Sequence, residues 1–154
     1  SVSAATTTTF IRVNRVYVSN AGAYGASNTG AITVETTAGV VVAYVDAGYG
    51  QTKMAMFTVP ANKRAFIKRI SVITEGTKTV DLDLWRRDDA DLITAPFGSK
   101  RIVREITGAE GVINFNYDSF IGPFEPKTDI WASGSTSSGT VGVGLEYDIV
   151  LVNI

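Results

Sequence analysis

The chain contains no cysteine and no histidine among its 154 residues. Without cysteine, a disulfide framework, a thiolate metal site and a cysteine nucleophile are all excluded. Without histidine, the chain lacks the usual general base near neutral pH, the commonest metal ligand and any Ser-His pair. Carboxylates, lysines, tyrosines and hydroxyls are what remain for chemistry. We therefore expect a protein that binds and assembles, with no catalytic residues and no cofactor.

A strong net charge is also lacking, since 14 basic side chains face 15 acidic ones and the formal charge is −1. Such a chain carries no strong field to attract nucleic acid or an anionic membrane. The longest wholly apolar run, Val40 to Val45, is far shorter than the roughly 20 residues that a membrane helix needs. Nothing in Ser1–Thr9 resembles a signal peptide. We therefore expect neither a nucleic-acid partner nor a membrane partner.

The first nine residues, SVSAATTTT, are small or β-branched and carry no charged side chain. Such a segment cannot build a core, so we expect residues 1–9 to form a flexible N-terminal arm. Because Thr and Val favour strands, the arm has an alternative, which is to order by adding to the sheet edge of a neighbouring molecule. The remaining length suits one domain, and we expect a single β-sandwich over residues 10–154.

After the arm, the sequence predicts one β-strand after another, separated by turn residues at the spacing of a sandwich or barrel. The clearest is Thr140–Val152, where the odd positions from 141 to 151 are apolar and the even positions from 142 to 148 are glycine or acidic. Thr79–Arg87 alternates in the same way, with Trp85 on the outward face. We expect an all-β, antiparallel β-sandwich of about eight to ten strands with little or no helix. The candidate strands are Phe10–Ser19, Ala31–Thr36, Val40–Asp46, Lys53–Val59, Arg64–Thr74, Thr79–Arg87, Arg101–Thr107, Val112–Tyr117, Asp129–Ala132 and Thr140–Val152.

Four segments between these strands are predicted to differ from them. Pro60–Lys63 has the proline and asparagine of a tight turn and should join two strands as a hairpin. Asn20–Gly30 and Ser133–Gly139 are rich in glycine with asparagine or serine, so we expect exposed, flexible loops. Arg87–Ala95 is the one stretch in which we expect a helical turn, capped by its aspartates.

Five aspartates follow one another closely in the sequence and are the only candidates for a metal site. Clustered carboxylates can hold Ca²⁺, which prefers six to eight oxygen ligands. Against this, the EF-hand pattern is missing, and Arg86 and Arg87 stand among the acids and can neutralise them. We interpret the cluster as a salt-bridged edge and keep a metal as the weaker alternative. The residues are Asp81, Asp83, Asp88, Asp89 and Asp91.

Aromatic side chains offer a further alternative, a platform on which sugar rings stack. The competing interpretation is that aromatics supply the core and the subunit contacts, as in most β domains, and we favour it. A glycan is therefore the less favoured partner. The aromatics in question are Trp85, Trp131, Tyr24, Tyr49 and Tyr117.

Four stretches, taken together in order and spacing, resemble β-sandwich virion proteins of tailed bacteriophages, especially marine ones. The similarity spans nearly the whole chain after the arm, and no single motif in it is specific. The stretches are Val16–Val18 with Gly22, Tyr24–Gly25 and Asn28–Ile32; Ala47–Thr52; Phe57–Lys63; and Glu146–Val152.

The resemblance implies a capsid decoration (cement) protein, with a tail or fibre component as the alternative; a carbohydrate-binding module, suggested by the aromatic residues, is the second alternative. It implies a jelly-roll-like sandwich, a homo-oligomer with a trimer favoured, and the major capsid protein or other virion proteins as partners. The protein would be made in the host cytoplasm and reside in the virion, on the capsid surface. We expect the contacts among Ser1, Val2, Thr6, Thr9, Phe10, Tyr24, Tyr49, Trp85 and Trp131.

Overall fold

The computed structural model describes residues 5–6, 10, 12–19, 27–92, 94 and 98–154. The chain divides into two compact units, Ser1–Met54 and Ala55–Ile154. No local feature of the sequence marks a boundary at Met54, and the expectation of one domain over residues 10–154 stays a prediction.

The first unit contains one antiparallel pair of strands, β1 (Ile32–Glu35) and β2 (Val41–Val45). The turn between them closes through hydrogen bonds from the Thr36 amide to the Val40 carbonyl and from the Gly39 amide to the Thr36 carbonyl. Both strands match their predicted ranges. The predicted strand Phe10–Ser19 is not found, because over its described residues only Tyr17 pairs, in an isolated bridge with Gln51.

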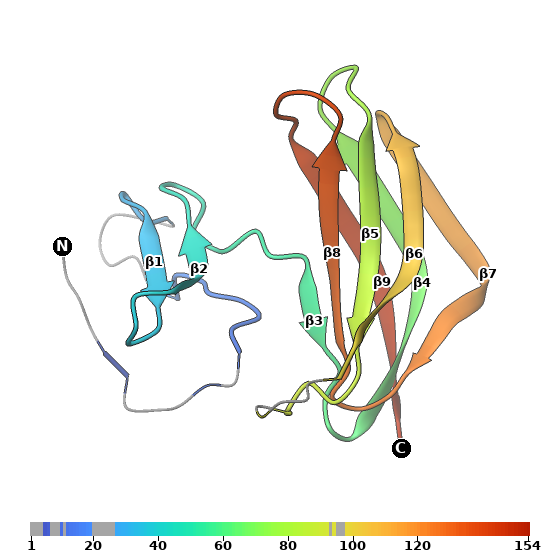
Figure 1. Ribbon diagram of the computed structural model, residues 1–154, viewed down its shortest axis with the longest axis horizontal. Helices are drawn as coiled ribbons and strands as arrows, with labels where there is room; N and C mark the ends of the chain where they lie inside the picture. The colour runs from blue at the N-terminus through green and yellow to red at the C-terminus, as the bar shows by residue number, and fades with distance from the viewer. Residues whose placement is uncertain (1–4, 7–9, 11, 20–26, 93, 95–97) are drawn as a thin grey trace. The chain divides into compact units, whose positions relative to one another are not determined.

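The second unit is a sandwich of two antiparallel sheets, as expected from the sequence. Figure 1 shows β8, β5 and β6 in front of β9, β4 and β7. One sheet has the strand order β3-β8-β5-β6 and the other the order β7-β4-β9. The described residues form no helix that is long and apolar enough to cross a membrane. The bounds are β3 Met56–Thr58, β4 Lys63–Thr74, β5 Val80–Arg87, β6 Lys100–Ala109, β7 Val112–Phe124, β8 Asp129–Thr136 and β9 Val143–Asn153.

The hydrophobic core lies between the two sheets. Strand β4 supplies Ala65 and Ile67 and then, after a register shift between Ile67 and Arg69, Ile70 and Val72. The shift inserts one residue, which explains why the apolar pattern of this segment does not alternate cleanly. From the facing sheet, β5 contributes Val80, Leu82 and Leu84, all buried, as its alternation predicted.

Three further sequence expectations are corrected by the structure. The turn Pro60–Lys63 forms, with the Lys63 amide donating to the Pro60 carbonyl, but it connects β3 and β4, which belong to different sheets and are not a hairpin. The predicted loop Ser133–Gly139 begins inside β8, which runs to Thr136. At Gly134 an added Cβ would lie 2.8 Å from a Leu82 methyl, so the lack of a side chain here suits the close pairing of β8 with β5.

The third correction concerns Arg87–Ala95. The described residues there form a turn and no helical turn, and Asp89 has a positive φ of 52°. The turn is closed by a hydrogen bond from the Leu92 amide to the Asp89 carbonyl. Aspartate tolerates this left-handed conformation better than most residues, so it serves the turn here and does not cap a helix.

Candidate interaction surfaces

An apolar cluster lies on the outward face of the three-stranded sheet. Phe66 of β4 stands opposite Val150 of β9, and the Phe66 and Phe120 rings lie 6.2 Å apart between centroids. Val152, two residues along β9, shares this face. Phe120 and Val152 remain 48% and 47% exposed. We call Phe66, Phe120, Val150 and Val152 the Phe66 patch.

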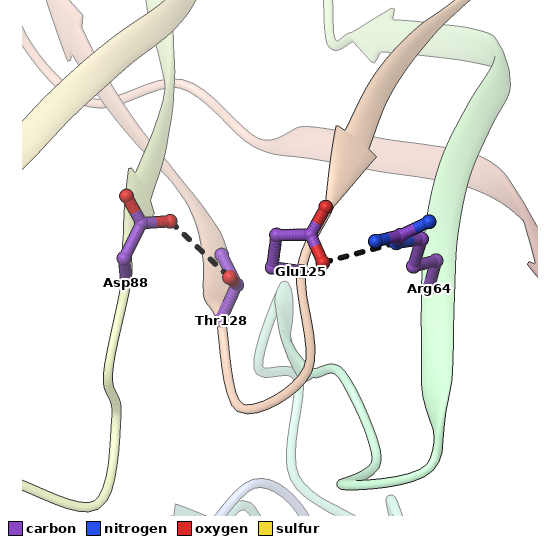
Figure 2. Close-up of polar contacts among 4 residues, drawn as sticks. All are labelled: Arg64, Asp88, Glu125 and Thr128. Atoms are coloured by element: carbon purple, nitrogen blue, oxygen red, sulfur yellow. Dashed lines mark hydrogen bonds and ion pairs between the residues drawn. The ribbon is translucent and has the colours of Figure 1, made fainter. Parts of the chain in front are cut away.

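Ion pairs border the Phe66 patch on two sides. The Arg64 Nε lies 3.0 Å from a Glu125 carboxylate oxygen (Figure 2), and the Arg69 Nε lies 3.0 Å from Asp148. All four side chains are 41–53% exposed, so each pair contributes little to stability. An apolar centre with a polar rim is the usual composition of a protein–protein contact surface.

The outward face of the four-stranded sheet carries both tryptophans of the chain. Trp85 of β5 and Trp131 of β8 stand directly opposite each other, with ring centroids 6.4 Å apart and planes 15° apart. The Lys100 ammonium lies 4.3 Å from the Trp85 ring centre, and the Trp85 indole donates a 2.8 Å hydrogen bond to the Ser133 hydroxyl. Each Trp85 contact stiffens this face, because cross-strand aromatic pairs and cation–π contacts both stabilise a sheet.

The five predicted aspartates do not gather into one site. Within the described part of the chain, no group of three or more Asp, Glu, His or Cys side chains is placed to hold a metal ion. Asp81 accepts a hydrogen bond from the Gly108 amide, and Asp83 lies on the outward face of β5. Asp91 lies 2.5 Å from the Lys127 ammonium, and this hydrogen bond, with the charge of Asp91, raises the pKa of Lys127.

Asp88 joins two of the connections at one end of the sandwich. Its carboxylate accepts hydrogen bonds from Arg86, at 2.9 Å, and from the buried Thr128 hydroxyl, at 3.2 Å (Figure 2). Next to Thr128, the buried Asp129 carboxylate accepts a 2.6 Å hydrogen bond from the Thr58 hydroxyl. These contacts tie the connection after β5 and the start of β8 to β3, so the acids serve the architecture here.

In the first unit, the structure describes three of the expected contact residues. Thr6 and Phe10 are exposed, and Tyr49 is exposed beneath the Lys53 ammonium, which lies 3.6 Å from its ring centre. An open hollow of about 390 Å³ lies along β2, lined by Val41–Tyr44, Asp46, Gln51, Lys53 and Met54. Ser1, Val2, Thr9 and Tyr24 lie outside the described residues.

Of the predicted aromatics that the structure describes, Trp85 and Trp131 are the two that lie together. Tyr117 lies in β7, with its ring 5.9 Å from the Arg104 guanidinium carbon, and Tyr49 belongs to the other unit. Sequence reasoning missed the Phe66 patch altogether. The sequence does contain a hint of the patch, because Phe66 and Val150 are apolar residues on the outward face of their strands, where polar residues are usual. The register that sets them opposite each other is, however, a tertiary property.

Comparison of the chain with protein-family models, curated proteins and solved structures finds no match. The resemblance to phage virion proteins therefore stays an expectation.

Proposed function

We propose that this chain is a structural protein of a phage virion that decorates the capsid and bridges neighbouring capsomers. The observation that carries the proposal is the Phe66 patch, an exposed apolar surface with a charged border on the three-stranded sheet. Scattered exposed apolar residues are normal, but a contiguous group of this kind marks a binding surface. The resemblance of the sequence supplies the partner, a capsid protein.

The strand order supports the jelly-roll-like form of this sandwich. The strands pair as one long folded hairpin, with β5 beside β6, β4 beside β7 and β3 beside β8. Jelly rolls contain eight strands in two sheets with Greek-key connections. The second unit supplies seven of them, in sheets of four and three.

A cement protein acts by holding its neighbours together and carries out no reaction. A standard contact buries about 800 Å² on each partner, which gives moderate affinity when only one contact is made. Engaging two or three capsomers at once raises the overall avidity by about 10²–10⁴.

The experiment that tests the proposal is the location of the chain in an electron-microscopy map of the virion. Decoration of the shell predicts hundreds of copies per particle. A few copies, or a few dozen, placed on the tail would support the alternative of a tail or fibre component. Absence of the chain from purified virions would contradict both.

Carbohydrate binding is a second candidate function, favoured by the Trp85–Trp131 pair on one outward face. Both tryptophans of the chain belong to this pair, so their fluorescence reports on this face alone. Quenching or a blue shift on titration with a glycan found by array screening would support it. No response on the array from the folded protein would count against it.

A further inference from the structure

The two sheets of the second unit end in four edge strands, and three of these have features that discourage pairing with another chain. β3 has only three residues. β6 carries Lys100, Arg101, Arg104 and Glu105, and its pairing with β5 has two register shifts. β7 contains Pro123 and also shifts register twice against β4. Short length, charge, proline and bulges are the usual means by which proteins protect sheet edges.

The fourth edge, β9, has none of these protections along most of its length. All eleven of its residues pair with β4, and the one register shift of this pairing, between Ile67 and Arg69, places its extra residue on β4, so β9 itself has no bulge. In the described part of the chain, β4 is its only partner. Its charged residues are Glu146 and Asp148, and the five residues from Ile149 to Asn153 carry no charge.

The uncharged end of β9 is apolar on both faces. Val150 and Val152 point outward into the Phe66 patch, while Leu151 points inward opposite the fully buried Ala65. Although it faces the core, Leu151 is 42% exposed, because the sheet ends beside it. A strand added at this edge would cover Leu151 and satisfy a row of backbone amides and carbonyls.

We propose that β9 pairs antiparallel with β9 of a second copy of this chain, about a two-fold axis that passes beside Val150. The two three-stranded sheets then join into one sheet, with the Phe66 patches of both copies on the same face. This contact does not depend on the virion proposal. Because it is two-fold, it gives dimers, whereas the resemblance favours trimers.

The charges of β9 are compatible with this register and disfavour registers centred closer to Asp148. With Val150 opposite its own counterpart, Asp148 stands opposite Val152 of the other copy and Glu146 opposite Ile154. The two Asp148 carboxylates are then about 13 Å apart along the strands, beyond the Debye length of about 8 Å at physiological ionic strength. A register centred on Tyr147 would instead place Glu146 opposite Asp148, which costs free energy. In the proposed register, odd-numbered residues of one copy lie opposite odd-numbered residues of the other. The inward-facing side chains of both copies therefore lie on the same face of the joined sheet.

Cysteine crosslinking tests the contact directly, because the chain has no cysteine of its own. In the full chain, V150C should form a disulfide-linked dimer on mild oxidation, since opposed Cα atoms in an antiparallel pair lie about 4.5–5.5 Å apart, within disulfide range. V143C is the matched control: it is a similarly exposed valine on β9, but in this register it faces no residue of the partner. Equal, slow oxidation of both variants would overturn the proposal.

Two further measurements identify the occupant of the edge. A mixture of D148C and V152C should give the mixed disulfide in preference to either self-disulfide, which fixes the register. A T6C and V150C mixture that crosslinks more readily than V150C alone would show that the N-terminal segment occupies the edge, and the β9–β9 contact would be discarded.

Sedimentation equilibrium of the unmodified chain should show a monomer–dimer equilibrium. L151K places an inward-pointing charge on the edge, and it should weaken dimerisation at least about tenfold while the circular dichroism spectrum keeps its β form. I102K is the control, because Ile102 is an exposed residue on the β6 edge, and it should leave the dimer unchanged.

A wild-type chain that stays monomeric up to high concentration would also overturn the proposal. The crosslinking result stands even if L151K fails to fold.

Discussion

Tyr147 lies on the inward face of β9, opposite the buried Ile70, and burial raises the pKa of its hydroxyl to about 12. In the unfolded chain the hydroxyl titrates near pH 10. Between these two values the unfolded state has lost the proton and the folded state still holds it. The contribution of Tyr147 to stability is therefore complete below pH 10 and is lost as the pH rises towards 12.

We predict that the free energy of unfolding falls by up to about 2 kcal/mol between pH 9 and pH 12 because of this residue. The measurement is urea unfolding at several pH values for the wild type and for Tyr147→Phe, in which the other five tyrosines are unchanged. The difference between the two curves should shrink or change sign as the pH rises. A difference that is constant with pH would contradict the prediction.

A second tyrosine, Tyr117, carries a hydroxyl group in an unfavourable environment. Its hydroxyl is buried and has no hydrogen-bond partner within the described residues. Burying a hydroxyl without a partner costs about 1–3 kcal/mol. We predict that Tyr117→Phe raises the free energy of unfolding by about 1 kcal/mol, as measured by denaturant unfolding. Tyr44→Phe, at an exposed position of β2, is the control and should have no effect.

At the scale of elements, the pairing of β5 with β8 creates a contact that neither strand has alone. It sets Trp85 opposite Trp131, and the neighbouring β6 adds Lys100 over the Trp85 ring. Three strands from different parts of the sequence thus share one stack of side chains.

We predict a coupling free energy of about 0.5–1.5 kcal/mol between the two tryptophans in a double-mutant cycle of Trp85→Ala and Trp131→Ala. Chemical denaturation followed by circular dichroism is the measurement, because the variants lose the fluorescent side chains. Trp85→Phe keeps a ring and loses the hydrogen bond to Ser133, so it should retain part of the coupling. Strict additivity of the two alanine substitutions would show that the rings do not interact.

At the scale of the whole molecule, the main core belongs entirely to the second unit. Every residue of the hydrophobic cluster, together with the partly buried residues packed against it, falls between Phe57 and Ile149 and so lies within Ala55–Ile154. We therefore predict that a fragment of residues 55–154 folds by itself, with a cooperative thermal transition and a β-type circular dichroism spectrum. A shorter fragment that starts at residue 60 lacks β3 and the buried Val59 and should melt at a lower temperature. A fragment 55–154 that shows no cooperative transition would contradict the prediction.

The N-terminal arm makes a separate prediction at this scale. Deletion of residues 1–9 should weaken attachment to the phage particle and leave the melting temperature almost unchanged, because the described residues of this segment, 5–6, are exposed and contribute nothing to the buried core. Co-sedimentation with particles and thermal denaturation are the measurements. Equal retention of the deleted and the full-length chain on particles would show that the arm takes no part in binding.

Much of the sandwich was predictable, and the reason is local. The strict alternation in Thr140–Val152 and Thr79–Arg87 predicted β9 and β5 and their buried faces, because the side-chain period of a strand is two wherever the strand lies. Other elements were misjudged where tertiary contacts override local preference. Ser133–Thr136 has the composition of a loop, but these residues pair with β5 and extend β8, and Gly134 lies against Leu82.

The sequence by itself determined the fold class, the faces of the long strands and the absence of thiol and imidazole chemistry, since composition and period two do not depend on which strands meet. Only the tertiary structure decided which residues become neighbours, such as Phe66 beside Val150 and Trp85 beside Trp131. It also decided that the aspartates take part in hydrogen bonds and ion pairs, and that β9 is the edge strand without protection. Register and sheet order depend on residues far apart in the chain, so no local pattern encodes them.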